Sequence, residues 1–284
     1  MTLCLVRGCG DIGSAVAHML FSAGYAVVIH DVADPSFARR GMAFADAMFD
    51  GVAVLEGVAG RRTKGIFSIR WMLDRREEIP LVAENFTKIL EHLRPHVLID
   101  ARMNKRSIPE KQFGLAPLTI GLGPNFVAGE TTDLVVETAW EALGRIIESG
   151  SSLPLAGEPR EINGYGRERY IYAPADGRFE TSHEIGARII HGEPIASIGT
   201  EIVRAPLDGS LRGITRGGVQ VVAGTKVVEI DPRGRPEKAF GIAERPGKIA
   251  QAVLAAVAEC SPHADGPRQV KRQAAPVRFN PASY

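Results

Sequence analysis

The chain has 284 residues, which is enough for two domains of ordinary size. Its formal net charge of +1 argues against a general nucleic-acid-binding protein, because such proteins usually have a strongly positive surface. No apolar run reaches the roughly 18 residues that span a bilayer, so we expect no membrane association. The three cysteines form no CxxC pair, and the N-terminus starts with a strand-like run rather than a signal peptide. These features predict a cytoplasmic protein.

The first 150 residues alternate between strand-like and helix-like segments. In chain order we expect a strand at Thr2–Val6, a helix at Ile12–Ser22, a strand at Ala26–Ile29, a helix at Glu84–Leu93, strands at Val97–Ile99 and Leu118–Ile120, and a helix at Trp140–Glu148. Such alternation is typical of a parallel sheet covered by helices. Residues 1–150 are therefore predicted to form a Rossmann-like nucleotide-binding domain, followed by a linker at Ser149–Pro159.

A GxGxxG loop, formed by Gly8, Gly10 and Gly13, follows the first strand and opens the first helix. In that context the backbone amides bind a diphosphate, and an acid after the second strand binds a ribose hydroxyl. Asp31 stands at that position and favours NAD, whereas Arg39 and Arg40 would favour NADP if their loop covers the site. The alternative is a glycine turn kept only for packing. Cys9, beside the helix N-terminus, is a less favoured candidate for a reactive thiolate.

Two later loops carry further candidate site residues. Asp100 ends a strand, and Lys105 follows it as a candidate proton donor or phosphate ligand that Asp100 would orient; a solvated basic loop is the alternative. The predicted catalytic residues are Lys105 and Asp100. The predicted cofactor-binding residues, for NAD, NADP or another nucleotide-bearing cofactor, are Gly8, Gly10, Asp11, Ile12, Gly13, Asp31, Arg39, Arg40, Gly121, Gly123 and Asn125. No His, Cys, Asp or Glu cluster has metal-ligand spacing.

An internal repeat occupies the C-terminal half. Ala173–Gly199 and Ala205–Asp231 align without a gap at an offset of 32 residues, and both begin Ala-Pro-x-Asp-Gly. The turn glycines and β-branched pairs predict two copies of one β-unit that pack on each other. We expect residues 160–245 to form a biotinyl/lipoyl-like β-barrel. The joint, Gly199–Arg204, has no lysine, so a swinging-arm carrier is not expected. A helix is predicted at 246–260 and a mobile tail at 261–284.

The chain as a whole resembles a known family. The stretches VRGCGDIGSAVAHML, ARRGMAFADAMFDG, IDARMNK, APLTIGLGPNFVAG, DLVVET, LGRII, INGYGRERYIYAPADG and VRAPLDGSLRG occur in one order. Together they resemble the YqeB-like proteins associated with selenium-dependent molybdenum hydroxylases, distant companions of XdhC-type maturation factors. The resemblance implies a preserved set of Arg7, Gly8, Gly10, Asp11, Arg39, Arg40, Asp100, Lys105, Gly121, Gly123 and Pro124.

One segment departs from the family pattern. Ala139–Ala142 stands where the family has Asn-Arg-Gly-His, so a histidine with a chemical role there would be missing. The resemblance implies a nucleotide-binding accessory or maturation protein for a molybdenum hydroxylase. The alternatives are a stand-alone NAD(P)-dependent oxidoreductase and a non-catalytic assembly factor. The expected partners are a molybdoenzyme client, a small-molecule ligand and a second copy of the chain, with no nucleic acid and no membrane.

Overall fold

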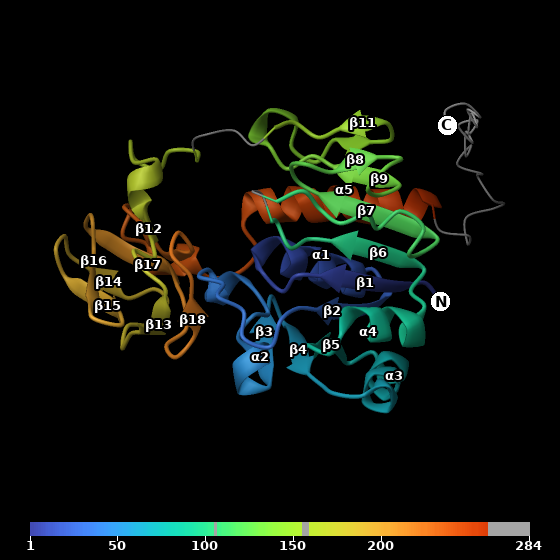
Figure 1. Cartoon of the computed structure of the whole chain (residues 1–284), viewed down its shortest axis with the longest axis horizontal. Coiled ribbons are helices and arrows are strands. Elements are labelled where there is room, and N and C mark those ends of the chain that lie inside the picture. The colour runs from blue at the N-terminus through green and yellow to red at the C-terminus, as the bar shows by residue number, and fades with distance from the viewer. Residues whose placement is uncertain (105–106, 155–158, 261–284) are drawn as a thin grey trace, which may run out of the picture.

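The computed structural model describes residues 1–104, 107–154 and 159–260. Figure 1 shows a large sheet flanked by helices and, beside it, a smaller unit built mainly from strands. Each unit has a hydrophobic core of its own. Within the described residues, no helix is both long and apolar enough to cross a membrane.

The large sheet has nine strands in the order β10-β9-β7-β6-β1-β2-β5-β4-β3. Its strands are β1 (Leu3–Arg7), β2 (Ala26–His30), β3 (Val52–Leu55), β4 (Val58–Arg62), β5 (Glu78–Val82), β6 (Val97–Asp100), β7 (Leu118–Leu122), β9 (Leu134–Val136) and β10 (Ile146–Ile147). The inner pairs are parallel. Both edges are antiparallel, because β3 pairs with β4 and β10 with β9 in that sense. Consecutive strands β1 and β2 lie on one side of a switch point and β6 on the other.

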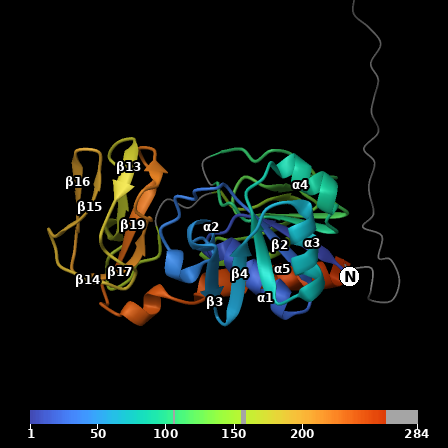
Figure 2. The same ribbon diagram turned by 90° about the horizontal axis from the view of Figure 1, so that it is seen from below.

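Helices cover both faces of this sheet (Figure 2). On one face α1 (Asp11–Ser22) packs against α5 (Glu244–Cys260), and on the other lie α3 (Ile66–Arg75) and α4 (Phe86–Leu93). Strand β1 serves both cores, since its residues alternate: Cys4 and Val6 pack toward α1, and Leu5 packs toward α3 and α4. The apolar face of α5 completes the first core, so the end of the described chain returns to its beginning.

The smaller unit consists of two four-stranded sheets, β12-β19-β17-β14 and β16-β15-β13-β18. Their strands are β12 (Tyr170–Tyr172), β13 (Gly177–Glu180), β14 (Arg188–Ile189), β15 (Pro194–Ile198), β16 (Glu201–Arg204), β17 (Gly209–Ile214), β18 (Gln220–Val221) and β19 (Lys226–Asp231). The predicted repeat is confirmed, because β13, β14 and β15 begin 32 residues before β17, β18 and β19. The two halves also exchange a strand, with β14 pairing with β17 and β18 with β13.

Hydrogen bonds across the halves explain the repeated Ala-Pro-x-Asp-Gly. The carboxylate of Asp176 accepts a hydrogen bond from the Ala223 amide at 2.7 Å, and that of Asp208 accepts one from the His191 amide at the same distance. These two bonds are equivalent under the 32-residue offset. Each aspartate therefore holds a turn of the opposite half, which neither half could do alone.

The predicted fold class, a Rossmann-like parallel sheet followed by a biotinyl/lipoyl-like β-barrel, is wrong. The large sheet is mixed rather than parallel, because a hairpin and a short strand close its edges antiparallel. Further antiparallel sheets accompany it: β8 (Val127–Ala128) with β11 (Gly150–Ser151), and the two four-stranded sheets, which do not join into one closed barrel among the described residues.

The helix predicted at Trp140–Glu148 is also absent. A single 3₁₀ turn at 140–142 leads through Gly144, whose φ is +82°, into β10. Gly144 needs this left-handed conformation, and an added Cβ there would lie 3.3 Å from the carbonyl oxygen of Lys248 in α5. The tail at 261–284 lies outside the described residues.

Candidate functional site: a basic crevice beside the glycine loop

The glycine loop is needed for close packing at the switch point. Gly8 has a φ of +109°, and a Cβ there would lie 2.9 Å from the carbonyl oxygen of Ala101, in the loop after β6. A Cβ on Gly13 would collide with the Gly8 carbonyl, and one on Gly10 would lie 2.9 Å from the ring of Phe37. The three glycines thus bring β1, α1 and the loop after β6 into contact.

Protein carboxylates already bind the amides of this loop. The Asp31 carboxylate accepts a hydrogen bond from the Cys9 amide at 2.6 Å, and the Asp11 carboxylate accepts one from the Ile12 amide at 3.0 Å. Asp31 therefore lies on the loop itself and acts as the anion at the helix N-terminus. Cys9 is fully buried, and burial together with the Asp31 charge raises the pKa of its thiol, which stays protonated.

Next to this loop, one buried carboxylate is surrounded by four cationic side chains. Glu229 on β19 has no exposed surface. It accepts two hydrogen bonds from Arg39, at 2.6 and 3.0 Å, and one each from Arg169 and Lys226, both at 3.3 Å, while Arg212 lies 3.8 Å away. We call these five residues the Glu229 cluster. It joins the two units, because Arg39 belongs to the large unit and the other four to the smaller one.

The surroundings of the cluster leave positive charge in excess. Arg39 also donates to Asp11 at 2.7 Å, and Arg245, at the start of α5, lies close enough to interact with Asp11 and Arg39. These seven residues comprise five cations and two acids. Of the nearby acids, Asp231 is paired with Arg233, and Glu137, whose carboxylate accepts three backbone amide bonds, adds one further negative charge near Arg245, which leaves the cations in the majority. The net charge of this region therefore favours an anion.

Burial and repulsion from Arg39 both lower the pKa values of two cations of the cluster, Lys226 and Arg212. Burial lowers the pKa of Lys226, and Arg39 lowers it further, against the opposing charge of Glu229. Burial and Arg39 likewise lower the pKa of Arg212. For Glu229, burial raises the pKa, but Arg39, Lys226 and Arg212 lower it more, so the carboxylate is ionised at any ordinary pH.

Comparison of the two repeat halves shows which residues the strands of the smaller unit need in order to form. At the positions equivalent to Arg212, Lys226 and Glu229, the first half has Glu180, Pro194 and Ser197. The same strands therefore form without these charges. The repeat residues of the cluster, Arg212, Lys226 and Glu229, all lie in its second half, which indicates a role beyond holding the strands together. This break in the repeat is visible in the sequence, although none of the predicted site residues came from it.

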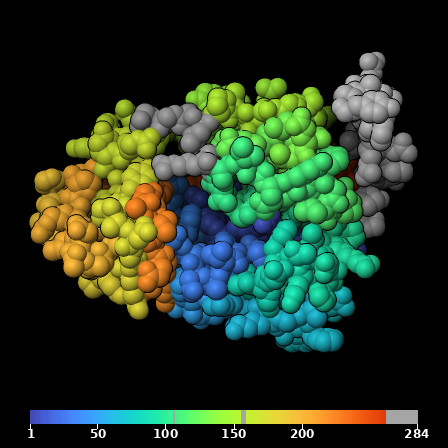
Figure 3. All heavy atoms as spheres, viewed as in Figure 1, coloured from blue at the N-terminus to red at the C-terminus, as the bar shows by residue number. Residues whose placement is uncertain are grey.

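The surface of the molecule is hollowed between the two units. Figure 3 shows a depression in the middle of the molecule, with atoms of the N-terminal segment at its floor and the strand unit, the segment after β2 and the segment after β6 around it. We call this depression the crevice. The N-terminal ends of α1 and α5, with their partial positive charge, lie on the side of the large unit that faces the strand unit (Figure 1).

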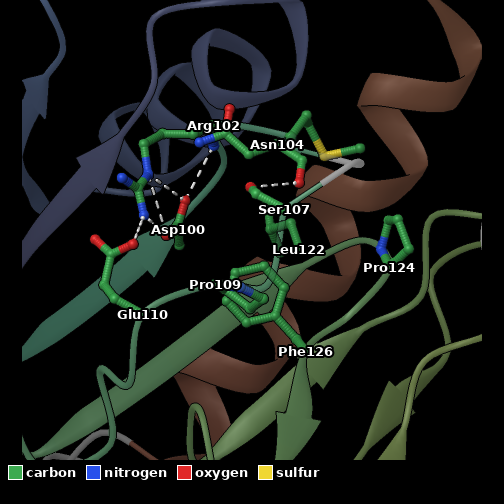
Figure 4. Close-up of a pocket in the computed structure, with 10 residues that line it drawn as sticks. Asp100, Arg102, Asn104, Ser107, Pro109, Glu110, Leu122, Pro124 and Phe126 are labelled. Atoms are coloured by element: carbon green, nitrogen blue, oxygen red, sulfur yellow. Dashed lines mark hydrogen bonds and ion pairs between the residues drawn. The ribbon is translucent and has the colours of Figure 1, made fainter.

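A pocket of about 330 Å³ lies at the carboxyl ends of β6 and β7. Figure 4 shows Arg102 facing Asp100 and Glu110 on one side, with Leu122, Pro124 and Phe126 on the other. Asp100 is buried and accepts hydrogen bonds from Arg102 and from Gln112. Burial raises the pKa of Glu110, but hydrogen bonds from Arg102 and Arg7 lower it more, to about 2. Acids and arginines balance here, so this pocket has no comparable charge excess.

The structure brings only some of the predicted site residues together. Arg39 and Asp11 join the Glu229 cluster, whereas Arg40 bonds to Asp46 and to the Ile214 carbonyl. The loop 121–125 borders the pocket: Gly121 packs against Phe126, Gly123 against Met103, and Asn125 donates to the Ser107 carbonyl. Asp100 is engaged by Arg102 and Gln112, and Lys105 lies outside the described residues, so a pairing between these two stays a prediction. No group of three or more His, Cys, Asp or Glu that could hold a metal occurs in the described ranges.

Comparison of the sequence with known proteins finds a relative. The chain is 36% identical, over 259 residues, to the uncharacterized protein YqeB of Escherichia coli K12. The match covers 90% of this chain and 47% of YqeB, so the chain spans about half the length of that relative. The similarity supports the resemblance to YqeB but says nothing of a molybdenum hydroxylase. No model of a known protein family matches the chain.

Several solved structures match at low similarity. An aspartoacylase family protein from Mesorhizobium loti is 12% identical, with 81% of this chain and 84% of that chain covered and a TM-score of 0.26. A succinylglutamate desuccinylase/aspartoacylase from Rhodobacter sphaeroides is 17% identical, with 75% and 61% covered and a TM-score of 0.22. One of the same description from Shewanella amazonensis is 13% identical, with 81% and 90% covered and a TM-score of 0.25.

The function predicted from the sequence, an NAD(P)-binding accessory protein of a molybdenum hydroxylase, is wrong. The carboxylates of Asp31 and Asp11 bind the loop amides on which that prediction relied, and the match to YqeB gives no such role. The oxidoreductase and the non-catalytic assembly factor gain no support from these findings either. NAD or NADP as a ligand stays a prediction that none of these observations tests.

Proposed function

We propose that this chain binds a small organic anion carrying at least two negative charges, such as a di- or tricarboxylate or a phosphate ester, in the crevice. The observation that carries the proposal is the surplus of cations around Glu229. Excess buried charge is unfavourable unless a counter-charge compensates it. A bound polyanion would supply that charge, and the lowered pKa values of Lys226 and Arg212 fit a site that gains stability when it is filled.

Arg212 is the cation of the cluster whose contacts most favour a bound anion. Its side chain is 13% exposed, and its Nε atom is buried without a hydrogen-bond partner among the described residues. Leaving such a donor unpaired is costly, so an anion that accepts from it gains more than it would from an exposed arginine. Because Glu229 is already bonded bidentately by Arg39, Arg212 remains available to a ligand.

The test is calorimetric titration with citrate and with pyrophosphate, on the wild type and on two arginine variants. Arg212→Ala should weaken binding by about tenfold or more, as expected for the loss of a charge-assisted hydrogen bond of about 1.5–3 kcal/mol. The matched control is Arg178→Ala, whose side chain is 64% exposed and bonded to Glu180 on the far strand β13. If neither citrate nor pyrophosphate binds, or if Arg212→Ala and Arg178→Ala weaken binding equally, the proposal is contradicted.

A further inference from the structure

Two apolar surfaces of the large unit are not covered by any other element within the described residues. The first is a ridge on α3, where Phe67 is 85% exposed and Trp71, one turn later, is 61% exposed. The opposite side of the helix buries Ile69 against the sheet, so the ridge points away from the sheet. Two adjacent aromatic side chains left this exposed are typical of an interaction surface.

The second surface is a floor formed by the hairpin β3–β4 at the edge of the sheet (Figure 1). On β3, Val52 is 38% exposed and Val54 is 68% exposed. The strand register sets their side, because Val54 lies opposite Ala59, and Ala59 lies beside Glu78 of β5. Glu78 shares a face of β5 with Val82, which belongs to the core beneath α3 and α4. The floor therefore lies on the same face as α3, where no helix of the described chain covers it.

The edge strand β3 also lacks the side chains that protect an uncovered edge. Its sequence, Val-Ala-Val-Leu, has no charge, whereas β16, an edge strand of the smaller unit, begins with Glu201 and ends with Arg204. Native proteins protect edges that stay in solvent with charged side chains. The contrast indicates that β3 is covered in the working protein.

The ridge and the floor together form a step. Helix α3 packs on β5, so it stands beside the floor and rises above it by about one helix diameter, roughly 10 Å. A second copy of the chain, turned by a two-fold axis, fits such a step, since the ridge of each copy then lies on the floor of the other. The large aromatic rings would meet the small and branched side chains of the floor. Such a contact is isologous, so it closes as a dimer and leaves neither surface uncovered.

We infer that the ridge and the floor are the two halves of one dimer interface, occupied by a second copy of this chain. At about 150–250 Å² for each fully buried aromatic side chain, the exposed parts of Phe67 and Trp71 in two copies amount to roughly 600 Å². Burying them covers a similar area of floor, so the total reaches the ~1,200 Å² at which stable interfaces begin.

Sedimentation velocity of the full chain measures the dimer directly. The wild type should sediment at twice the chain mass of 30.6 kDa at micromolar concentration. Trp71→Glu disrupts the ridge and Val54→Arg charges the floor, and each should raise the dimer Kd by about thirtyfold or more, as for a hot-spot residue. Val222→Arg is the matched control, because Val222 is 64% exposed on the smaller unit. All three side chains lie at the surface, so the urea midpoints should stay near the wild-type value.

A mixture of the two variants tests whether the ridge meets the floor. In a mixed dimer of Trp71→Glu with Val54→Arg, one contact is unchanged and the other pairs the new glutamate with the new arginine. The mixture should therefore form dimers that neither variant forms alone. A wild type that stays monomeric, or a dimer that neither substitution weakens, overturns the inference. If both substitutions weaken the dimer and the mixture does not restore it, the two surfaces do not meet and the reciprocal contact is excluded.

Discussion

At the residue scale, Glu229 acts as the counter-ion of the junction between the two units. It is the carboxylate shared by Arg39, Arg169, Arg212 and Lys226, and it has no contact with solvent. Removing one partner of a buried ionic group is costly because the remaining charges stay buried without compensation. The cluster is therefore both a structural joint and, through its surplus charge, the candidate binding site.

Glu229→Gln should lower the free energy of unfolding by about 3 kcal/mol, because four cations lose their shared acid. Added citrate should restore part of this loss, since a ligand present at 100 times its Kd stabilises the folded state by about 2.7 kcal/mol. Urea unfolding with and without citrate measures both effects. The control is Glu180→Gln, at the repeat position equivalent to Arg212, where the side chain is 54% exposed and should matter little. A Glu229→Gln protein as stable as the wild type would refute this role.

At the element scale, most of the elements that the sequence predicted are present, but several strands and helices of the large unit and most of the arrangement were not predicted. Strand β1, helix α1 and the repeat were predictable because glycine turns and apolar periodicity are local signals. The hairpin β3–β4 and the antiparallel edges were not, because the choice between parallel and antiparallel pairing depends on neighbours distant in sequence. The cluster was missed for the same reason: Arg39 and Glu229 are 190 residues apart.

The two repeat aspartates should contribute equally to the stability of the smaller unit. Asp176→Ala and Asp208→Ala each remove one carboxylate bond to an amide of the opposite half. We expect each to cost about 1–2 kcal/mol, as for the loss of a capping side chain. Chemical denaturation of both variants compares the two values. A cost confined to one aspartate would show that the halves are not equivalent in the way the hydrogen bonds indicate.

At the scale of the whole molecule, acidic side chains hold the two units together. Arg39 bridges Asp11 and Glu229, and Arg216 of the smaller unit binds Asp50 of the larger one through two hydrogen bonds. The pKa of Asp50 is lowered by the hydrogen bond from Arg216, which outweighs the opposite effect of burial. For Asp11, burial raises the pKa, but Arg39 lowers it more. With Glu229, all three acids thus bind protons less readily in the folded state than in the unfolded one.

The lowered pKa values of these three acids determine how the stability of the protein changes with pH. An acid whose pKa is depressed by folding stabilises the protein above its unfolded pKa, about 3.9 for Asp and 4.3 for Glu. That contribution is lost as the pH falls through the lower, folded value. We therefore expect the urea midpoint to be nearly constant from pH 7 to about 5 and to fall steadily from about 4.5 downward. Glu229→Gln should show a smaller fall than the wild type over the same range, because one of the protons taken up on unfolding has been removed. Parallel curves for the two proteins would mean that Glu229 titrates alike in both states, and the charged joint between the units would then lose its main support.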